Sequence, residues 1–362
     1  MIIQIEPWIG KEELEEVISV IESTFLTESK KTAEFETRFK AFTNAEHAIA
    51  YASGSTALFA SLKVLGIEKG DEVILPALTF VATPNSVLLA DAKPIFVDID
   101  RETFQIDPNL IEQHITLRTK AIMPVHLYGQ SCNMDAIMAI AKKHRLLVIE
   151  DAAQGCGVLY KGKHVGTFGD IGVISFYGNK TITTGEGGMI LTNSAYLARK
   201  LYMYKNHGRP RRGTFVHDEI GYNFSITEMQ SAVGLAQLSK FDRIKKRKDD
   251  IRMYYERALE DVSPLRLTFI DPRCSPVHWF SSILVPNVES LQNFLLKYEI
   301  QSRRFFPPLH RQPCYRFMNI PHEQYPNANY AFDHGLSLPS SVHTTDEQLA
   351  EVVRRIKEFY GS

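Results

Sequence analysis

Short apolar runs alternate with helix-length segments from residue 48 to residue 151, and this alternation limits the fold more than any other feature of the sequence. Apolar runs of about four to six residues bounded by Gly, Pro or Asn are typical of buried strands. Helical segments of about ten residues fill the intervals, and crossovers of that kind join parallel strands. The alternation therefore predicts an α/β fold with a mainly parallel sheet and helices on both faces. The expected strands span 48–52, 72–75, 94–98, 121–125 and 146–151.

A charged helix expected at residues 241–259 leads into a second part of the chain. We predict a large domain at 1–240, followed by the connecting helix and a smaller C-terminal α+β domain at 241–362. A chain of 362 residues is long enough to bury two such cores. The other elements expected in this part are a strand at 279–285 and helices at 289–298 and 345–360.

Charge and cysteine content exclude several classes of function. The chain carries 41 basic and 42 acidic residues, so its bulk charge favours neither nucleic acid nor an anionic membrane. The four cysteines are widely spaced, without the CxxC or Cys/His pattern of a zinc site, and we expect no metal. No window approaches the roughly 18 apolar residues of a membrane span. These features favour a reduced, cytoplasmic protein.

The segment GDIGVISFYGNKTITTGEGGMILTN, residues 169–193, places a lysine between two expected core strands. Lys180 follows the apolar run 171–176 and precedes a glycine-rich stretch and a second apolar run. Glycines let backbone approach a ligand closely, and an amine held in a closed site condenses with a carbonyl group. One hypothesis is a lysine that forms a Schiff base with pyridoxal phosphate (PLP); the alternative is a surface lysine in a hairpin turn.

Other polar or aromatic residues follow strands that end at the same sheet edge. Ser53-Gly54-Ser55-Thr56 joins a strand to a helix, either as a phosphate-binding helix N-terminus or as an ordinary cap. Phe80 follows the strand 72–75 and either stacks on a flat ring or belongs to the core. Asp151 ends a buried strand and needs a partner, either a pyridinium nitrogen, a structural ion pair or a helix cap.

Together these residues supply each contact that PLP needs. The phosphate-type turn suits the phosphate, the stacking aromatic residue the ring face, the strand-end acid the ring nitrogen, and Lys180 the aldehyde. Ser175 is a further polar residue at a strand end. Two polar loops add candidate substrate contacts: the Arg-rich stretch 207–218 and the loop 303–310. The Arg-rich stretch either touches an anionic substrate or is simply solvated. The pattern predicts a PLP enzyme and leaves its substrate open.

The chain is similar over essentially its whole length to the DegT-type (StrS-like) sugar aminotransferases. The resemblance rests on the segment around Lys180, on VIEDAAQ and GYNFSITEMQSAVGLAQL, and on SGSTAL, LPALTFVATPN, MPVHLYGQ, PPLHRQP and LSLPSSVHTTDEQL. Within that family, FYGNKTITTGEGGM and MPVHLYGQ most resemble the GDP-perosamine synthases. The resemblance implies the type I aspartate-aminotransferase fold, a homodimer with active sites shared between subunits, and a place in O-antigen or lipopolysaccharide biosynthesis.

The resemblance also implies roles for residues that contact the cofactor. Lys180 would bind PLP covalently, Asp151 would pair with the pyridine nitrogen, Gln154 would lie near the ring hydroxyl, and Phe80 would stack on the ring. The phosphate would be bound by Gly54, Ser55 and Ser175, and by Asn223 from the partner subunit.

The resemblance further implies a reaction with two substrates. L-glutamate would donate its amino group to the 4-keto group of a nucleotide-linked 4-keto-6-deoxy sugar, GDP-4-keto-6-deoxymannose giving GDP-perosamine. His310 and Arg211 would lie near the nucleotide sugar. Many relatives carry Arg where this chain has Ser225, which leaves that contact undefined, whereas retention of Lys180 in place of histidine favours transamination over dehydration.

Three alternatives stay open from the sequence. The same chemistry can act on a UDP- or dTDP-linked sugar, or at a 3-keto group. The chain can instead be a PLP-binding regulatory paralogue without turnover. A Rossmann dehydrogenase is the third alternative, but the first strand is not followed by the GxGxxG that such an enzyme needs.

Overall fold

A seven-stranded sheet forms the centre of the structure, a computed structural model that describes residues 1–361. The strand order is β1-β9-β8-β5-β4-β2-β3, and β9 alone among these strands runs against the other six. The prediction of a mainly parallel sheet is therefore confirmed. The strands are β1 (His47–Tyr51), β2 (Glu72–Pro76), β3 (Lys93–Val97), β4 (Thr119–Ile122), β5 (Leu147–Asp151), β8 (Ile171–Ser175) and β9 (Gly188–Thr192).

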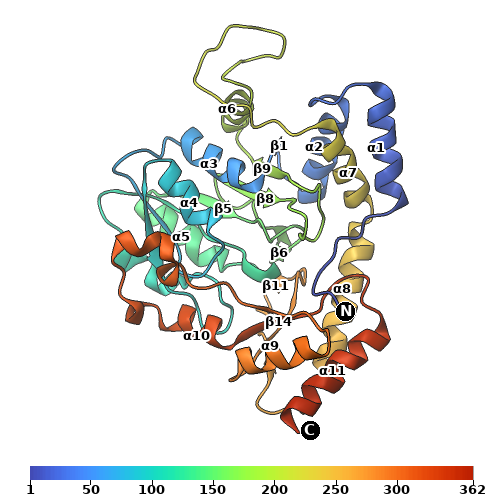
Figure 1. Ribbon diagram of the computed structural model, residues 1–362. Coiled ribbons are helices and arrows are strands. Elements are labelled where there is room, and N and C mark those ends of the chain that lie inside the picture. The colour runs from blue at the N-terminus through green and yellow to red at the C-terminus, as the bar shows by residue number, and fades with distance from the viewer. Residues whose placement is uncertain (362) are drawn as a thin grey trace.

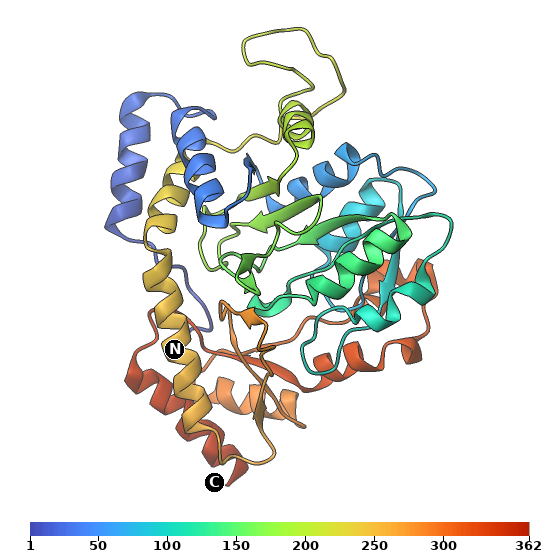
Figure 2. The same ribbon diagram turned by 180° about the vertical axis from the view of Figure 1, so that it is seen from behind.

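Helices cover both faces of this sheet (Figures 1 and 2). One face packs against α3 (Gly54–Val64), α4 (Ala82–Leu89) and α6 (Ala195–Lys205) through a continuous apolar cluster. The other face packs against α2 (Lys30–Thr43), α5 (Met134–His144) and α7 (Glu228–Ser239). The helix α1 (Lys11–Ser23) lies outside this layer and contacts α7. Burial of both faces explains why these strands are almost wholly apolar.

A second, antiparallel sheet follows the long helix α8 (Phe241–Ala258). Its order is β10-β12-β14-β13, and α8, α9 (Val288–Lys297) and α11 (Asp346–Tyr360) share its apolar core. The three helices expected in this part of the chain are present, whereas the division into domains at residue 240 stays a prediction. The strands are β10 (Arg266–Leu267), β12 (Ser281–Leu284), β13 (Arg303–Arg304) and β14 (Gly335–Leu338).

Several short elements differ from the sequence-based expectations. The helix expected near 108–114 forms two 3-10 turns, η1 (Pro108–Leu110) and η2 (Glu112–His114), and the second ends where the backbone becomes extended at Ile115. The strand expected from Trp279 begins two residues later, at Ser281. Elements that were not expected are the strands β10, β13 and β14 of the antiparallel sheet, α10 (Pro326–His334), the 3-10 turns η3 (Leu127–Gly129), η4 (Leu309–Arg311), η5 (Pro313–Met318) and η6 (His322–Gln324), and a small sheet of β6 (Leu159–Tyr160), β7 (Lys163–His164) and β11 (Cys274–Ser275).

The loop between α6 and α7 projects from the body of the protein in both views (Figures 1 and 2). It is held at its base by a bridge between Asn206 and Asn223, and its apolar residues Phe215 and Ile220 are 87% and 84% exposed. Such exposure of large apolar side chains marks a surface that another molecule can cover. Within residues 1–361, none of the helices has the length and apolar character needed to cross a membrane.

Candidate active site

The candidate site lies at the carboxyl edge of the large sheet, where parallel α/β sheets bind ligands. The six parallel strands end at this edge and β9 begins there, because Ser175 pairs with Gly188, which also pairs with Tyr51. Asp151, the last residue of β5, lies beside Val173 of β8. The edge thus brings together the chain segments after β1, β2, β5 and β8, which carry most of the cofactor-contacting residues expected from the sequence.

Lys180 and Asp151 interact electrostatically across this edge. Lys180 lies in the β8–β9 connection, in a turn closed by its N–H donating to the Tyr177 carbonyl at 2.9 Å. Burial lowers the pKa of Lys180 to about 8, and the negative charge of Asp151 opposes that shift. Burial raises the pKa of Asp151, and a hydrogen bond from Thr83 and the positive charge of Lys180 oppose it. The two groups therefore stabilise each other's charged forms, as buried groups of opposite charge do.

The carboxylate of Asp151 is fixed by two donors. Thr83, in the first turn of α4, donates its hydroxyl to Oδ2 at 2.7 Å, and the Ala153 N–H donates to Oδ1 at 3.1 Å. The hydroxyl oxygens of Thr79 and Thr83 are 2.9 Å apart. Since Thr83 gives its proton to Asp151, Thr79 is the donor in that second contact. Asp151 is only 4% exposed, so these hydroxyl groups, rather than water, orient its carboxylate.

The N-terminus of α3 forms a cradle with two strands. The Ser53 hydroxyl caps the helix by accepting from the Thr56 N–H at 3.1 Å. A methyl group added to Gly54 would lie 3.0 Å from Cβ of Ser175, and one added to Gly188 would lie 2.7 Å from the Ser53 carbonyl carbon. The three segments therefore approach as closely as glycine allows. The first N–H groups of a helix lack intrahelical partners and favour an anion, so this cradle suits a phosphate.

Aromatic rings line the side of the site formed by the segment after β2. Phe80 is 54% exposed, so it is not a core residue, which excludes that alternative. Its ring lies 5.8 Å from that of Phe306, which in turn stacks on Tyr128 at 5.6 Å. Gln154 is buried and its Oε1 accepts from the Tyr128 N–H at 2.8 Å. Phe80 thus offers a ring face to a ligand, and Gln154 is oriented by the backbone of the loop after β4.

The structure does not gather the remaining predicted residues around Lys180. Asn223 and Arg211 are exposed in the connection between α6 and α7, and Asn223 lies at the base of the projecting loop, where it bridges Asn206. His310 is 8% exposed, stacks on Tyr325 at 4.7 Å, and shares a hydrogen bond of 3.0 Å between Nε2 and Oδ1 of Asn329. The neighbouring Leu309 N–H donates to the Ala77 carbonyl beyond the end of β2, which brings this loop to the sheet edge. Ser55 is exposed at the start of α3.

Trp279 and Thr83 contact candidate residues but were missed by sequence reasoning. The Nζ of Lys180 lies 4.3 Å from the centre of the Trp279 ring, and Trp279 Nε1 donates to the Asn179 carbonyl at 2.6 Å. Trp279 is the first residue of the strand expected at 279–285, and no local pattern marks it as a site residue. Thr83 falls in the helical interval expected between the strands 72–75 and 94–98. The signal that could have found it is a hydroxyl in the first turn of a helix that follows a strand end.

These groups fit PLP in kind. A helix N-terminus with Ser175 suits the phosphate, the buried carboxylate of Asp151 suits a protonated ring nitrogen, and the exposed ring of Phe80 suits the ring face. Lys180 supplies an amine whose pKa of about 8 leaves part of it unprotonated near neutral pH.

Comparison with known proteins supports the family resemblance seen in the sequence. The model of the DegT/DnrJ/EryC1/StrS aminotransferase family matches residues 7–357. The chain is 39% identical over 360 residues to GDP-perosamine synthase of Escherichia coli O157:H7, covering 98% of each chain. It is 41% identical over 330 residues to the pleiotropic regulatory protein of Geobacillus stearothermophilus, covering 90% of this chain and 88% of that protein.

A solved structure extends the comparison to the whole fold. The PLP form of the putative sugar aminotransferase Spr1654 from Streptococcus pneumoniae superposes with a TM-score of 0.94 at 26% identity, covering 99% of this chain and 98% of that one. The type I aminotransferase fold expected from the sequence is therefore confirmed.

Proposed function

The chain belongs to the DegT/DnrJ/EryC1/StrS aminotransferase family, and we propose that, as an enzyme of this class, it moves the amino group of L-glutamate onto the 4-keto group of a nucleotide-linked 4-keto-6-deoxy sugar. The proposed acceptor is GDP-4-keto-6-deoxymannose and the product GDP-perosamine. The similarity to GDP-perosamine synthase over nearly the full length of both chains supports this choice. PLP is the proposed cofactor, and the match to a PLP-form sugar aminotransferase supports it.

The observation that carries the proposal is the electrostatic interaction of Lys180 with Asp151 at the sheet edge that also holds the N-terminal cradle of α3. PLP, when bound, supplies an electron sink that stabilises negative charge on the carbon next to the amino group. Asp151 would keep a proton on the ring nitrogen, and Thr83 would keep Asp151 in place. Lys180 would take the proton from Cα of the amino donor and return one at the acceptor carbon, a role for which a pKa of about 8 is suited.

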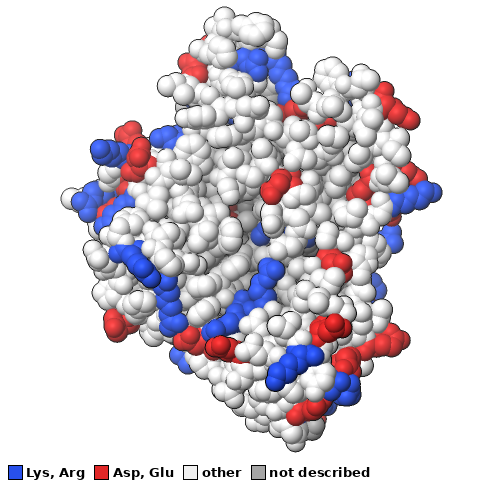
Figure 3. Space-filling model, in the orientation of Figure 1, with Lys and Arg blue, Asp and Glu red and all other residues white. Residues whose placement is uncertain are grey.

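The other site residues would bind and orient. Gly54, Ser55 and Ser175 would hold the phosphate, Phe80 would cover the ring, and Gln154 would lie near the ring hydroxyl. We further propose that the active site is completed in a homodimer, in which the projecting loop carries Asn223 and Arg211 to the partner's site. The exposure of Phe215 and Ile220 on that loop supports this arrangement. So does the face shown in Figure 3, whose centre is mostly free of charged side chains. His310 would contact the nucleotide sugar.

A second candidate function is regulation by a PLP-bound protein that does not turn over a sugar. The 41% identical relative named a pleiotropic regulatory protein favours it. Both candidates use the same PLP site, so they differ only in whether an amino sugar is formed.

The test is incubation of the purified protein with PLP, ¹⁵N-labelled L-glutamate and, in separate reactions, GDP-, UDP- and dTDP-linked 4-keto-6-deoxy sugars. Mass spectrometry should find ¹⁵N in a GDP-amino sugar, and a Lys180→Ala control should give none. A labelled UDP- or dTDP-amino sugar in its place would overturn the choice of nucleotide. Bound PLP with no labelled sugar in any reaction would overturn the transaminase and support the regulatory candidate.

A further inference from the structure

The turn that carries Lys180 is held by a side chain from a distant part of the sequence. The indole of Trp279 makes two contacts with this turn: its ring face receives Nζ of Lys180 at 4.3 Å, and its Nε1–H donates to the Asn179 carbonyl at 2.6 Å. Trp279 itself is 3% exposed. An ammonium group over an indole face is attracted by the ring's electron density, and the attraction strengthens where water is excluded. The same side chain therefore contacts both the backbone and the reactive end of this turn.

The segment that precedes Trp279 is anchored to the large-sheet part of the protein. Cys274 of β11 pairs with Tyr160 of β6, and the Val277 N–H donates to the Gly129 carbonyl at 3.1 Å. Gly129 has a φ of 79°, and a methyl group there would lie 1.9 Å from the Val277 carbonyl oxygen, so the contact requires glycine.

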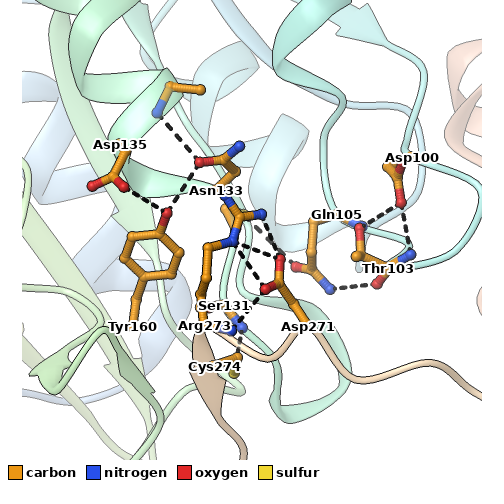
Figure 4. A network of polar contacts seen from close by, with 12 residues as sticks. Asp100, Thr103, Gln105, Ser131, Asn133, Asp135, Tyr160, Asp271, Arg273 and Cys274 are labelled. Carbon is orange, nitrogen blue, oxygen red and sulfur yellow. Dashed lines mark hydrogen bonds and ion pairs between the residues drawn. The ribbon is translucent and has the colours of Figure 1, made fainter.

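Polar contacts reinforce the same segment (Figure 4). Arg273 pairs with Asp271 at 2.6 Å, and the Tyr160 hydroxyl lies 3.1 Å from Oδ1 of Asn133. Together with the β11–β6 pairing, these bonds fix the path of the chain just before Trp279.

The backbone of Trp279 is held from the other side by Lys248. This buried lysine of α8 donates to the carbonyls of Trp279 at 3.2 Å and Ser340 at 3.3 Å. The Ser340 hydroxyl in turn accepts from the Ser281 N–H at 2.8 Å. Trp279 is therefore fixed between the antiparallel sheet and the large sheet, and its ring has little freedom to leave Lys180.

We propose that Trp279 is a positioning residue for Lys180. It would restrict the four-carbon side chain of Lys180 to rotamers that place Nζ in the site, and its Nε1–H would hold the turn through Asn179. The inference rests on the proposed role of Lys180 as the residue that binds PLP. It adds that a side chain outside the cofactor-contacting set determines where the amine lies, through contacts with the turn rather than with PLP.

The first test does not depend on PLP. An amine-acylating reagent is applied to the PLP-free protein from pH 7 to 10, and the labelling of Lys180 is followed by peptide mass spectrometry. At the high-pH plateau, Trp279→Leu should label Lys180 at least fivefold faster than wild type because the amine is no longer covered. Trp279→Phe keeps a ring but loses the indole N–H, so a rise of about twofold is expected. Trp8→Phe, at the other tryptophan of the chain, should not change the rate.

The second test is a double-mutant comparison read as the dissociation constant for PLP. Trp279→Leu should weaken PLP binding about tenfold in the wild-type background and less than twofold in a Lys180→Ala background. An equal loss in both backgrounds would mean that Trp279 contacts PLP or supports the fold, and would overturn the proposal.

The outcomes separate the two proposals. If labelling of Lys180 is within twofold of wild type in both Trp279 variants, the positioning role is wrong even where PLP binds normally. If labelling rises as expected but wild type binds no PLP, the positioning contact stands and the proposed function fails. Should Trp279→Leu not fold, the Trp279→Phe rate alone decides, because a rate equal to wild type would contradict the proposal.

Discussion

Asp151 opposes the burial that lowers the pKa of Lys180 to about 8, and Lys180 in turn opposes the burial that raises the pKa of Asp151. Asp151 is buried and Lys180 is half-buried. The pair therefore determines both how readily Lys180 gives up its proton and how readily Asp151 stays charged.

The rate at which the PLP-free protein captures PLP should depend on pH through Lys180. Its lowered pKa means that the neutral, nucleophilic amine is mostly present above about pH 8. The capture rate, followed by visible absorbance, should rise through about pH 8 and level off above it. Asp151→Asn removes the charge that raises this pKa and should move the midpoint lower. A midpoint near 10.5 in wild type, the ordinary value for lysine, would contradict the account.

Thr83→Val should reduce activity without unfolding the protein. The substitution keeps the shape of the side chain but removes the 2.7 Å hydrogen bond to Oδ2 of Asp151. A hydrogen bond to a charged group contributes roughly 1.5–3 kcal/mol, so kcat should fall about 10- to 100-fold. Thr37→Val, at a hydroxyl exposed on α2, is the matched control and should keep wild-type kcat. Equal kcat for both variants would show that Asp151 needs no support from Thr83.

Gly54→Ala should weaken PLP binding through the phosphate. The added methyl group would lie 3.0 Å from Cβ of Ser175, so either the helix N-terminus or Ser175 must shift. We expect the dissociation constant for PLP, measured by equilibrium dialysis, to rise about tenfold. Gly10→Ala serves as the control, because its methyl group would meet its nearest neighbour at 3.4 Å. An unchanged dissociation constant in Gly54→Ala would place the phosphate elsewhere.

Glu150→Gln, at the residue before Asp151 in β5, should lower the free energy of unfolding by an amount that depends on pH. The Glu150 carboxylate is fully buried and accepts from His126 at 3.0 Å and from the N–H groups of Gly166, Phe168 and Gly169. Although burial alone would raise the pKa of Glu150, the hydrogen bond and charge of His126 and the backbone donors hold it below its ordinary value of 4.5.

A carboxylate with a lowered folded pKa stabilises the fold above its unfolded pKa, and this contribution is lost as pH falls. The variant should therefore be less stable than wild type at pH 7 by about 3 kcal/mol, and the difference should shrink as pH falls below 4.5. Thermal unfolding of the PLP-free proteins across this range measures it. A difference that stays constant with pH would mean that Glu150 is not charged in the fold.

The sequence predicted those site residues that stand next to a strand end. Asp151, Ser175 and the Ser53–Thr56 turn could be placed together because parallel strands bring their carboxyl ends to one edge of a sheet. Lys180 could be placed with them because it lies between two apolar runs. No tertiary information was needed for these residues beyond the direction of the strands.

Residues that reach the site through tertiary packing could not be predicted. Trp279 lies 100 residues from Asn179 in sequence, and its contact depends on how β11 docks on β6. Tyr128 adopts a left-handed φ of 54°, which no pattern in the sequence predicts. The roles of Asn223 and Arg211 stay predictions, because both side chains are exposed in the single chain, Asn223 at the base of the projecting loop and Arg211 within it.

The most direct test of the central claim is to find where PLP is attached. The purified protein is loaded with PLP, treated with sodium borohydride to make any lysine–PLP linkage permanent, digested and analysed by mass spectrometry. The account predicts one phosphopyridoxyl group per chain, on the peptide that contains Lys180, and none in Lys180→Ala. A label on another lysine, or an unlabelled Lys180 in PLP-loaded protein, would contradict it.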